Sequence, residues 1–282
     1  MRMPPCCSSG STHGREGFAR TIVDVTRQAV TYASYLKVPE LLALQVERSA
    51  GADGPEHDEL LFIVIHQVYE LWFKQVRHEL LAVQRALESG DTDTALHLLN
   101  RVLKILKTLV AQVDVLETMT PLQFLSFRDR LESASGFQSG GFRRVEALLG
   151  MRDPAAARAQ PEASEARRAI EADQAGPSVW DSFLAYLAQR GHALPADATM
   201  PDERVQEVIV AVYRGDPDAA LVAERLVDLD EGVQEWSYRH VKMVERTIGT
   251  KAGTGGSSGV EYLRSTLFRP AFPDLWEIRS RL

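Results

Sequence analysis

The chain has 282 residues, and 45% of them are hydrophobic, which is enough to bury a large core. Its 32 Lys and Arg residues against 39 Asp and Glu residues give a net charge of −7, and no basic tract stands out, so we expect no nucleic-acid partner. No stretch approaches the roughly 20 apolar residues of a membrane span, so we expect no membrane partner.

The first residues of the chain lack the apolar side chains that a folded segment needs. Residues 1–17 are rich in Pro, Ser and Gly and lack the apolar core of a signal peptide, so we predict a disordered tail there. The only cysteines, Cys6 and Cys7, are adjacent and cannot staple the fold. A reducing compartment fits this usage, and we expect a cytoplasmic protein whose single domain covers residues 18–282.

Apolar residues recur with helical spacing along nearly the whole chain. We predict a short helix over 39–48, opened by Pro39, and a long helix over 57–89 that ends at Gly90-Asp91. A second long helix over 92–119 follows. The short connection predicts that the two long helices form an antiparallel pair.

The second half continues the helical pattern. Thr120 is the expected N-cap of the next helix, and Ser and Gly residues at 133–141 break it. Residues 151–177 are weakly hydrophobic, so we expect a partly helical, solvated surface excursion. The remaining predicted helices cover 142–150, 178–190, 202–213, 217–248 and 259–267. Because alternating strand patterns are nearly absent, the sequence predicts an all-α fold, one domain built on a helical bundle.

His66 lies on an apolar helical stretch, where an imidazole is costly unless it has a partner. Helical spacing places Phe62, His66, Phe73 and either Tyr69 or Glu70 on one face. Spacing alone favours a core histidine bonded to a neighbour such as Glu70. A ligand-facing histidine is the alternative.

His240 occupies a second apolar stripe, predicted to face the core, which consists of Leu229, Val233, Trp236, His240 and Met243. A neutral imidazole there suits an axial haem ligand, although spacing alone somewhat favours a core histidine. No Glu is followed by His three positions later, so the di-iron bundle pattern is missing. The cysteine count excludes a Cys-rich zinc site.

Two further segments carry possible binding chemistry. The Gly-rich segment Gly253–Gly259 would either bring backbone N–H groups close to a ligand or serve as a flexible linker. Arg128 follows two phenylalanines and could clamp a carboxylate with two parallel hydrogen bonds. The alternative is an arginine on a solvated face, paired with Asp129 or Glu132.

Several separated motifs, in order along the chain, resemble the tryptophan 2,3-dioxygenase family. Each motif is weak alone, but the series is highly specific. The motifs are Tyr32–Leu36, Leu41–Gln45, His57–Lys74, Phe127-Arg128, Ser135–Ser139, Val244–Gly249, Gly253–Gly259 and Phe272–Trp276.

The resemblance implies a b-type haem with His240 as the proximal iron ligand, and with Ser135 and Gly136 among the cofactor-binding residues. His66 would lie on the distal side near the substrate indole N–H, as an orienting group and not an obligatory base. Arg128 would bind the amino-acid carboxylate, and Thr254 would meet the ammonium and carboxylate end. The implied substrate pocket is lined by Tyr35, Leu36, Phe62, Phe124 and Leu131.

The resemblance also implies an assembly and a reaction. Tyr32 and its neighbours would come from an adjacent subunit of a homotetramer built as a dimer of dimers. With O2 as co-substrate, the enzyme would open the indole C2–C3 bond of L-tryptophan and give N-formylkynurenine, a reaction of tryptophan catabolism by the kynurenine pathway.

One departure from the family pattern keeps other functions open. Gly140-Gly141 stands where the family commonly has a Leu-Gln-like pair, and two glycines are expected to loosen the backbone near the substrate. The alternative is a haem monooxygenase of secondary metabolism that converts a tryptophan derivative, for example a β-substituted one, to a 2-oxindole. A non-catalytic haem- or indole-binding protein and a helical interaction module are further alternatives.

Overall fold

The computed structural model describes residues 29–49, 54–251, 253 and 259–282. The chain divides into two compact units, the first ending at Leu44 and the second covering Gln45–Leu282. The predicted tail over residues 1–17 lies outside the described residues.

The first unit holds two short helices, α1 (Tyr32–Leu36) and α2 (Val38–Leu41). The Thr31 side chain caps α1, and Lys37, in the left-handed conformation with φ 54°, separates the two helices. The predicted helix over 39–48 is wrong, because α2 ends at Leu41. In the second unit, the N–H groups of Arg48 and Ser49 donate to the Glu59 carboxylate and so are not available to a helical ladder.

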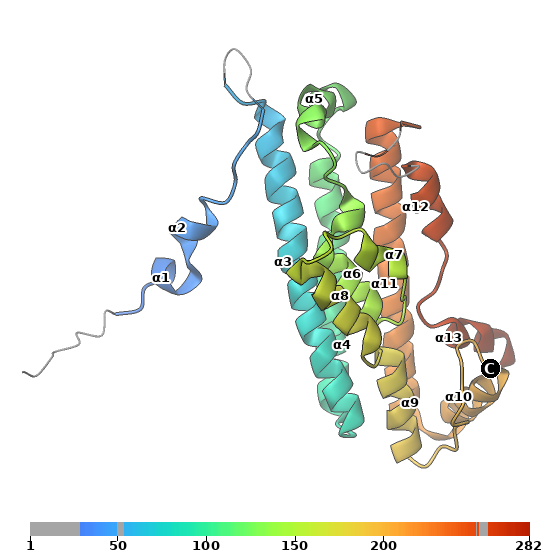
Figure 1. The fold of residues 1–282 in the computed structure, drawn as a ribbon. Helices are drawn as coiled ribbons and strands as arrows, with labels where there is room; N and C mark the ends of the chain where they lie inside the picture. Colours follow the sequence, from blue (N-terminus) through green and yellow to red (C-terminus); the bar gives the residue numbers. More distant parts are fainter. Residues whose placement is uncertain (1–28, 50–53, 252, 254–258) are drawn as a thin grey trace, which may run out of the picture. The chain divides into compact units, whose positions relative to one another are not determined.

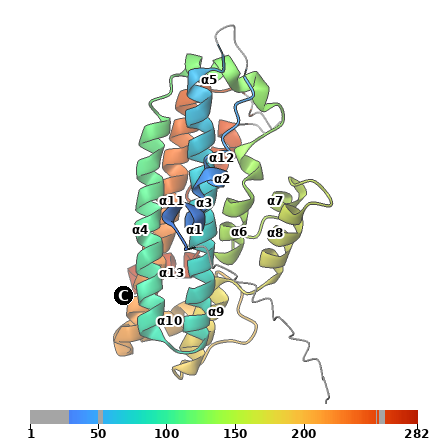
Figure 2. The ribbon, with the colours of Figure 1, turned by 90° about the vertical axis from the view of Figure 1, so that its left-hand side faces the viewer.

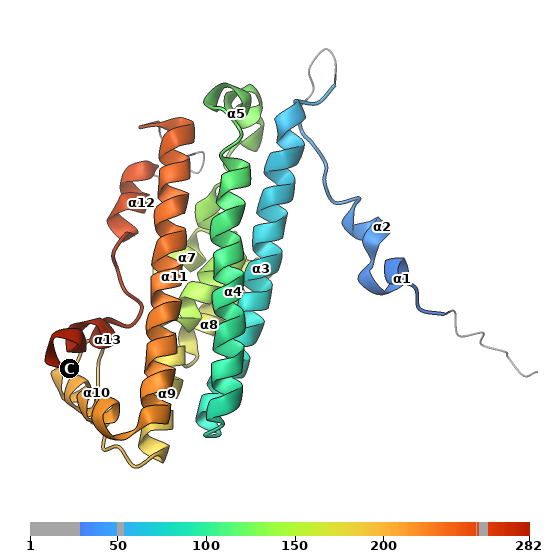
Figure 3. The same ribbon diagram turned by 180° about the vertical axis from the view of Figure 1, so that it is seen from behind.

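The second unit is built on three long helices, α3 (His57–Glu88), α4 (Thr92–Leu116) and α11 (Pro217–Ile248), which run side by side in both opposite views (Figures 1 and 3). The antiparallel pair of α3 and α4 was predicted and is confirmed. Gly90, at φ 75°, makes the turn between them, and the Asp91 side chain accepts a hydrogen bond from Thr94 N to start α4.

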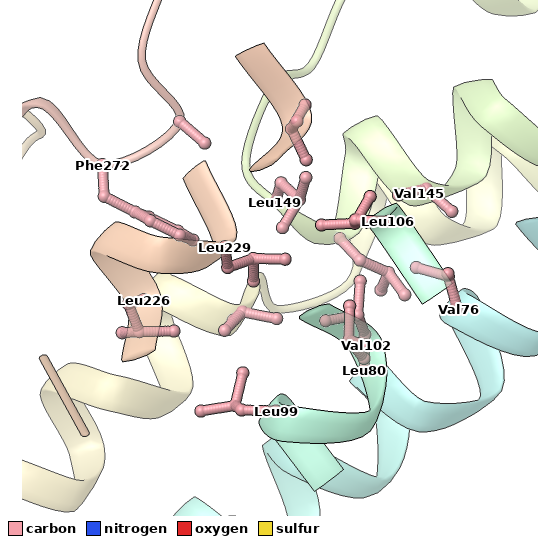
Figure 4. Close-up of a cluster of buried hydrophobic side chains, with 14 of the residues drawn as sticks. Val76, Leu80, Leu99, Val102, Leu106, Val145, Leu149, Leu226, Leu229 and Phe272 are labelled. Carbon is pink, nitrogen blue, oxygen red and sulfur yellow. The ribbon is translucent and has the colours of Figure 1, made fainter. Parts of the chain in front are cut away.

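The core fills the space between these helices, as the close-up in Figure 4 shows. Leu80 of α3, Leu99 of α4 and Leu226 of α11 are all fully buried, and each such side chain contributes about 1.5–3 kcal/mol by leaving water. Helices α4 and α11 approach closely at Gly232, where a Cβ atom would lie 3.0 Å from Leu106 Cδ1. Glycine at 232 lets the Leu106 side chain of α4 pack directly against the backbone of α11.

A wall of short elements follows α4: α5 (Pro121–Phe127), a 3-10 turn η1 (Arg128–Leu131), a second turn η2 (Gly136–Gln138) and α6 (Gly140–Leu148). The predicted N-cap Thr120 is confirmed, and it forms a capping box with Gln123. The predicted break lies between η1 and α6. Helix α6 starts at Gly140, two residues before the predicted start.

The excursion over 151–177 is partly helical, as predicted, with α7 (Pro154–Arg158) and α8 (Glu165–Ala175). The expectation that it is solvated is wrong for the inner face of α8, which lies beside α6 (Figure 2). Ile170 is fully buried there. Asp173 accepts hydrogen bonds from Arg77 of α3 at 2.7 and 2.5 Å and from Arg144 of α6 at 2.6 Å.

Four elements close the other end of the unit: α9 (Val179–Gln189), α10 (Glu203–Gly215), α13 (Pro273–Glu277) and the turn η3 (Ile278–Arg281). Helix α12 (Val260–Thr266) lies beside the C-terminal part of α11 (Figure 1). Buried Asp230 of α11 holds the C-terminal segment, since it accepts hydrogen bonds from the backbone N–H groups of Ala271 and Phe272 and from Trp276 Nε1. Within the described parts of the chain, no helix combines the length and apolarity that crossing a membrane requires.

Replacing Asp173 by Ala is expected to lower the free energy of unfolding by about 2–4 kcal/mol, because two arginines lose the partner of a largely buried ion pair. The side chains of Asp173, Arg77 and Arg144 are 10%, 24% and 31% exposed. Glu171→Ala on the same helix is the control: Glu171 is 50% exposed and pairs with Arg167 one turn away, so its loss should cost under about 0.5 kcal/mol. Urea unfolding measures both. Equal costs would contradict the buried anchor.

The Asp173 carboxylate also predicts that the free energy of unfolding depends on pH. Burial raises the pKa of Asp173, but the hydrogen bonds from Arg77 and Arg144 outweigh it, and the pKa lies below the ordinary value of 3.8. The stabilisation is therefore complete above pH 3.8 and is lost as the pH falls through the lowered pKa. Urea unfolding of the parent and of Asp173→Asn should give a stability difference that is constant from pH 7 to 5 and shrinks below pH 4. A difference that grows on acidification would contradict the assignment.

Candidate functional site

A cavity of about 490 Å3 lies inside the second unit, within the 300–1,000 Å3 range usual for small-molecule sites. Its walls come from α3, the end of α4, the α5–α6 wall, α11 and α12. Most of the lining is apolar. Two histidines, His66 and His240, and two arginines, Arg128 and Arg143, are among the polar groups.

Helix α3 presents one face to this cavity. Phe62, His66, Phe73, Tyr69 and Glu70 all line it, as their helical spacing predicts. The Phe62 ring lies 4.0 Å from the His66 ring and 5.8 Å from the Phe124 ring. Helical spacing left open whether Tyr69 or Glu70 shares this face. In the structure both side chains line the cavity.

His66 is held by its own helix. Its Nδ1 lies 2.7 Å from Phe62 O, and because a carbonyl only accepts, Nδ1 carries the hydrogen and Nε2 keeps its lone pair. The expected bond to Glu70 is therefore replaced by one to the backbone. The ring lies among many protein atoms, yet its side chain keeps an exposed surface and lines the cavity. Burial lowers its pKa, against the hydrogen bond to Phe62 O and the charge of Glu70, so His66 is neutral at pH 7.

His240 projects from the stripe of α11 that was predicted to face the core. Leu229, Val233, Trp236 and Met243 of that stripe are buried, and His240 is half-buried at the cavity. Its ring stacks on Trp236 with centroids 5.3 Å apart and planes 8° apart. Burial, together with the nearby His66 and Arg143, lowers the pKa of His240 to about 4. No hydrogen bond reaches this ring from the residues that the structure describes, so a neutral imidazole with an available lone pair faces the cavity.

The structure brings most of the predicted site residues together. The cavity-lining ones are Phe62, His66, Phe124, Arg128, Leu131, Ser135, Gly136 and His240. Tyr32, Tyr35 and Leu36 belong to the first unit, where they are exposed. Thr254 lies outside the described residues.

Two charged cavity residues were missed by the sequence reasoning. Arg143 Nη1 lies 2.5 Å from Glu146 Oε2, and Arg143 Nε donates to Phe137 O at 3.2 Å. The guanidinium carbon lies 4.8 Å from the centre of the Phe137 ring. Burial raises the pKa of Glu146 to about 7, although Arg143 opposes that shift. The i, i+3 spacing of Arg143 and Glu146 was the available signal, hidden by the glycines at the start of α6.

Gly140 and Gly141 do not loosen the wall, contrary to expectation. They are the first two residues of α6, and the Ser139 side chain caps that helix. Gly141 N donates to Glu70 Oε2 at 3.1 Å, and a Cβ atom at Gly141 would lie only 2.5 Å from the same oxygen. Glycine at 141 therefore permits a close approach between α6 and α3.

The chemistry of the cavity is that of a site for a large apolar ligand with carboxylate groups. In the described part of the chain, no group of three or more His, Cys, Asp and Glu side chains is arranged to hold a metal ion. Arg128 and Arg143 supply cations for carboxylates.

The sequence of this chain matches a family model and is similar to several known proteins. The family model described as tryptophan 2,3-dioxygenase matches residues 17–175 and 154–282. A protein of Anaeromyxobacter sp. (strain K) named tryptophan 2,3-dioxygenase is 59% identical over 261 residues, which cover 90% of this chain and 97% of the relative. One of the same name from Herpetosiphon aurantiacus is 56% identical over 263 residues, 90% of this chain and 99% of the relative. On this cavity and these matches, the chain belongs to the tryptophan 2,3-dioxygenase family.

Proposed function

We propose that this protein is a haem-dependent tryptophan 2,3-dioxygenase, which opens the indole C2–C3 bond of L-tryptophan with O2 and releases N-formylkynurenine. Both oxygen atoms enter the product. The observation that carries the proposal is the mostly apolar cavity that is lined by both His66 of α3 and His240 of α11, each of them neutral at pH 7.

The residues present fit a b-type haem. The macrocycle is apolar and carries two carboxylates, and the cavity offers apolar walls together with a buried cation, Arg143. His240 would hold the iron, since its depressed pKa keeps a lone pair available at pH 7 and its stacking on Trp236 fixes the ring plane. Ser135 and Gly136 line the same cavity and would lie at the cofactor. Haem iron supplies the redox chemistry that O2 activation needs.

The protein would bind and orient the substrate. Phe62, Phe124 and Leu131 offer an aromatic and aliphatic wall to the indole ring. Arg128, half-buried on the cavity wall, would pair with the substrate carboxylate. His66 Nε2 would accept a hydrogen bond from the indole N–H, because its Nδ1–H is already committed to Phe62 O. This fixed acceptor positions the ring, so no strong base is required.

The remaining assignments come from the family. Thr254 would meet the amino and carboxylate end of the substrate. Tyr32, Tyr35 and Leu36 would complete the pocket of an adjacent subunit in a homotetramer, a role to which their exposure in the first unit lends support. We place the enzyme in the cytoplasm, and its reaction in tryptophan catabolism.

The product of an aerobic reaction tests the function directly. Purified ferrous protein with L-tryptophan and O2 should give N-formylkynurenine, measured by its absorbance and by a mass gain of two oxygen atoms. A gain of one oxygen would replace the proposal by the monooxygenase alternative. Haem-loaded protein without any product would reject both oxygenase functions.

His240→Gly should abolish the Soret band of the histidine-ligated haem, and added imidazole should restore it, since the free ligand can occupy the vacated position. His78→Gly is the matched control, because His78 is exposed on α3 and does not line the cavity. Absorption spectra of haem-reconstituted proteins make the comparison. An unaltered Soret band in His240→Gly would assign the iron to another ligand.

Arg128→Ala should weaken binding of L-tryptophan by about 2–5 kcal/mol, because a carboxylate in the cavity loses its cation. The control is Arg130→Ala in the same turn η1, since Arg130 is exposed and lies outside the cavity lining. Spectral titration of the ferric haem gives both dissociation constants. Tryptamine, which lacks the carboxylate, should bind the parent and Arg128→Ala equally. If tryptamine binds the parent as tightly as tryptophan does, Arg128 is not a carboxylate clamp.

A further inference from the structure

Glu70 lies on the cavity face of α3, one turn beyond His66, and its carboxylate reaches the start of α6. One carboxylate oxygen, Oε1, accepts a hydrogen bond from Ser139 Oγ. The other, Oε2, accepts one from Gly141 N at 3.1 Å. The substrate and cofactor roles assigned to the site make no use of this residue, although it touches two elements that line the cavity.

The contact depends on the absence of a side chain at position 141. A Cβ atom there would lie 2.5 Å from Glu70 Oε2, 3.4 Å from Glu70 Cδ and 3.0 Å from Phe73 Cβ. At Gly140, one residue earlier, a Cβ atom would meet only Ala166 Cβ, at 3.9 Å. The two adjacent glycines are therefore not equivalent, and only Gly141 brings α6 within hydrogen-bonding distance of Glu70.

The segment that Glu70 holds forms one wall of the cavity. Ser139 Oγ also accepts from Phe142 N at 3.2 Å, so the Glu70 contact continues into the first turn of α6. The Phe142 ring packs 4.6 Å from Trp236, and Trp236 stacks on His240. On the N-terminal side of Ser139, residues 135–138 also line the cavity.

We propose that Glu70 is a positioning residue that latches the wall formed by residues 135–142 against α3, and that it thereby sets the width of the substrate cavity, with glycine at 141 as the requirement for the latch. The inference rests on the proposed function for the identity of the substrate. The latch itself is a pair of hydrogen bonds from Ser139 and Gly141 to the Glu70 carboxylate, so it has a readout that needs no turnover.

The test compares Gly141→Ala, Gly140→Ala, Glu70→Ala and the double variant Glu70→Ala/Gly141→Ala in the haem-loaded, full-length protein. Gly140→Ala is the matched control, because it adds the same methyl group to the same helix turn without meeting Glu70. The wall would contact the substrate equally before and during the reaction, so a displaced wall should raise KM with little change in kcat.

We expect Gly141→Ala and Glu70→Ala each to raise KM for L-tryptophan about fivefold, the effect of losing a hydrogen bond to a carboxylate at an open site, with kcat within about threefold of the parent. Gly140→Ala should keep the parent's KM. The double variant should be no worse than the poorer single variant, because removing the Glu70 carboxylate removes the 2.5 Å contact and leaves only the 3.0 Å approach to Phe73 Cβ. Hydrogen exchange of the backbone amides at 135–142 should accelerate in Glu70→Ala and not in Gly140→Ala.

Three results would overturn the latch: unchanged exchange at 135–142 in Glu70→Ala, equal KM values in the two glycine variants, or additive effects in the double variant. If Gly141→Ala fails to fold, Glu70→Ala decides alone, since it adds no atoms. A lower melting temperature with an unchanged KM would assign Glu70 a role in stability only. Absence of turnover in the parent would reject the proposed function, while the exchange measurement would still decide the latch.

Discussion

The helical repeats of α3 and α11 are the constraint on which the site depends. Each long helix buries one face against the shared core, and the same repeat carries one imidazole of each helix to the end of that face where the core gives way to a cavity. Moving either histidine by one position would turn it about 100° away from the cavity. Both histidines therefore face one cavity because each lies in phase with the buried face of its own helix.

Burial keeps the two imidazoles of this site neutral. The local contacts of each ring then decide which of its nitrogen atoms can accept a bond. Both histidines are kept neutral by desolvation, but only His66 has a backbone acceptor, which selects its Nδ1–H form. His240 has a ring neighbour, Trp236, in place of a hydrogen bond. One imidazole thus offers an oriented acceptor and the other an uncommitted lone pair. This difference supports assigning substrate orientation to His66 and metal binding to His240.

The sequence predicts the long helices, in which apolar residues recur over many turns. It does not predict the short elements that are held in place by single contacts. The long helices and the cavity face of α3 follow from apolar spacing over many turns, and His66 and His240 came with them. Helices α1 and α2 are too short to show a period. Helix α8 was taken as solvated because it buries Ile170 and one carboxylate, Asp173, in place of an apolar stripe. Arg143 was missed although a helix over 142–150 was predicted, because a single Arg–Glu pair at i, i+3 does not show which face of a helix meets a cavity.

The short elements from α5 to α6 explain how one wall of the cavity can be both firmly packed and rich in charged side chains. Adjacent residues on α6 point to different places: Arg144 pairs with Asp173 behind the wall, while Arg143 pairs with Glu146 at the cavity. The rear pair fixes the helix to α3 and α8, so the front pair need not contribute to packing. Glu146 and the face of the Phe137 ring together hold the Arg143 guanidinium at the cavity. A cation that is paired with a carboxylate in this way costs less to bury than an isolated cation would.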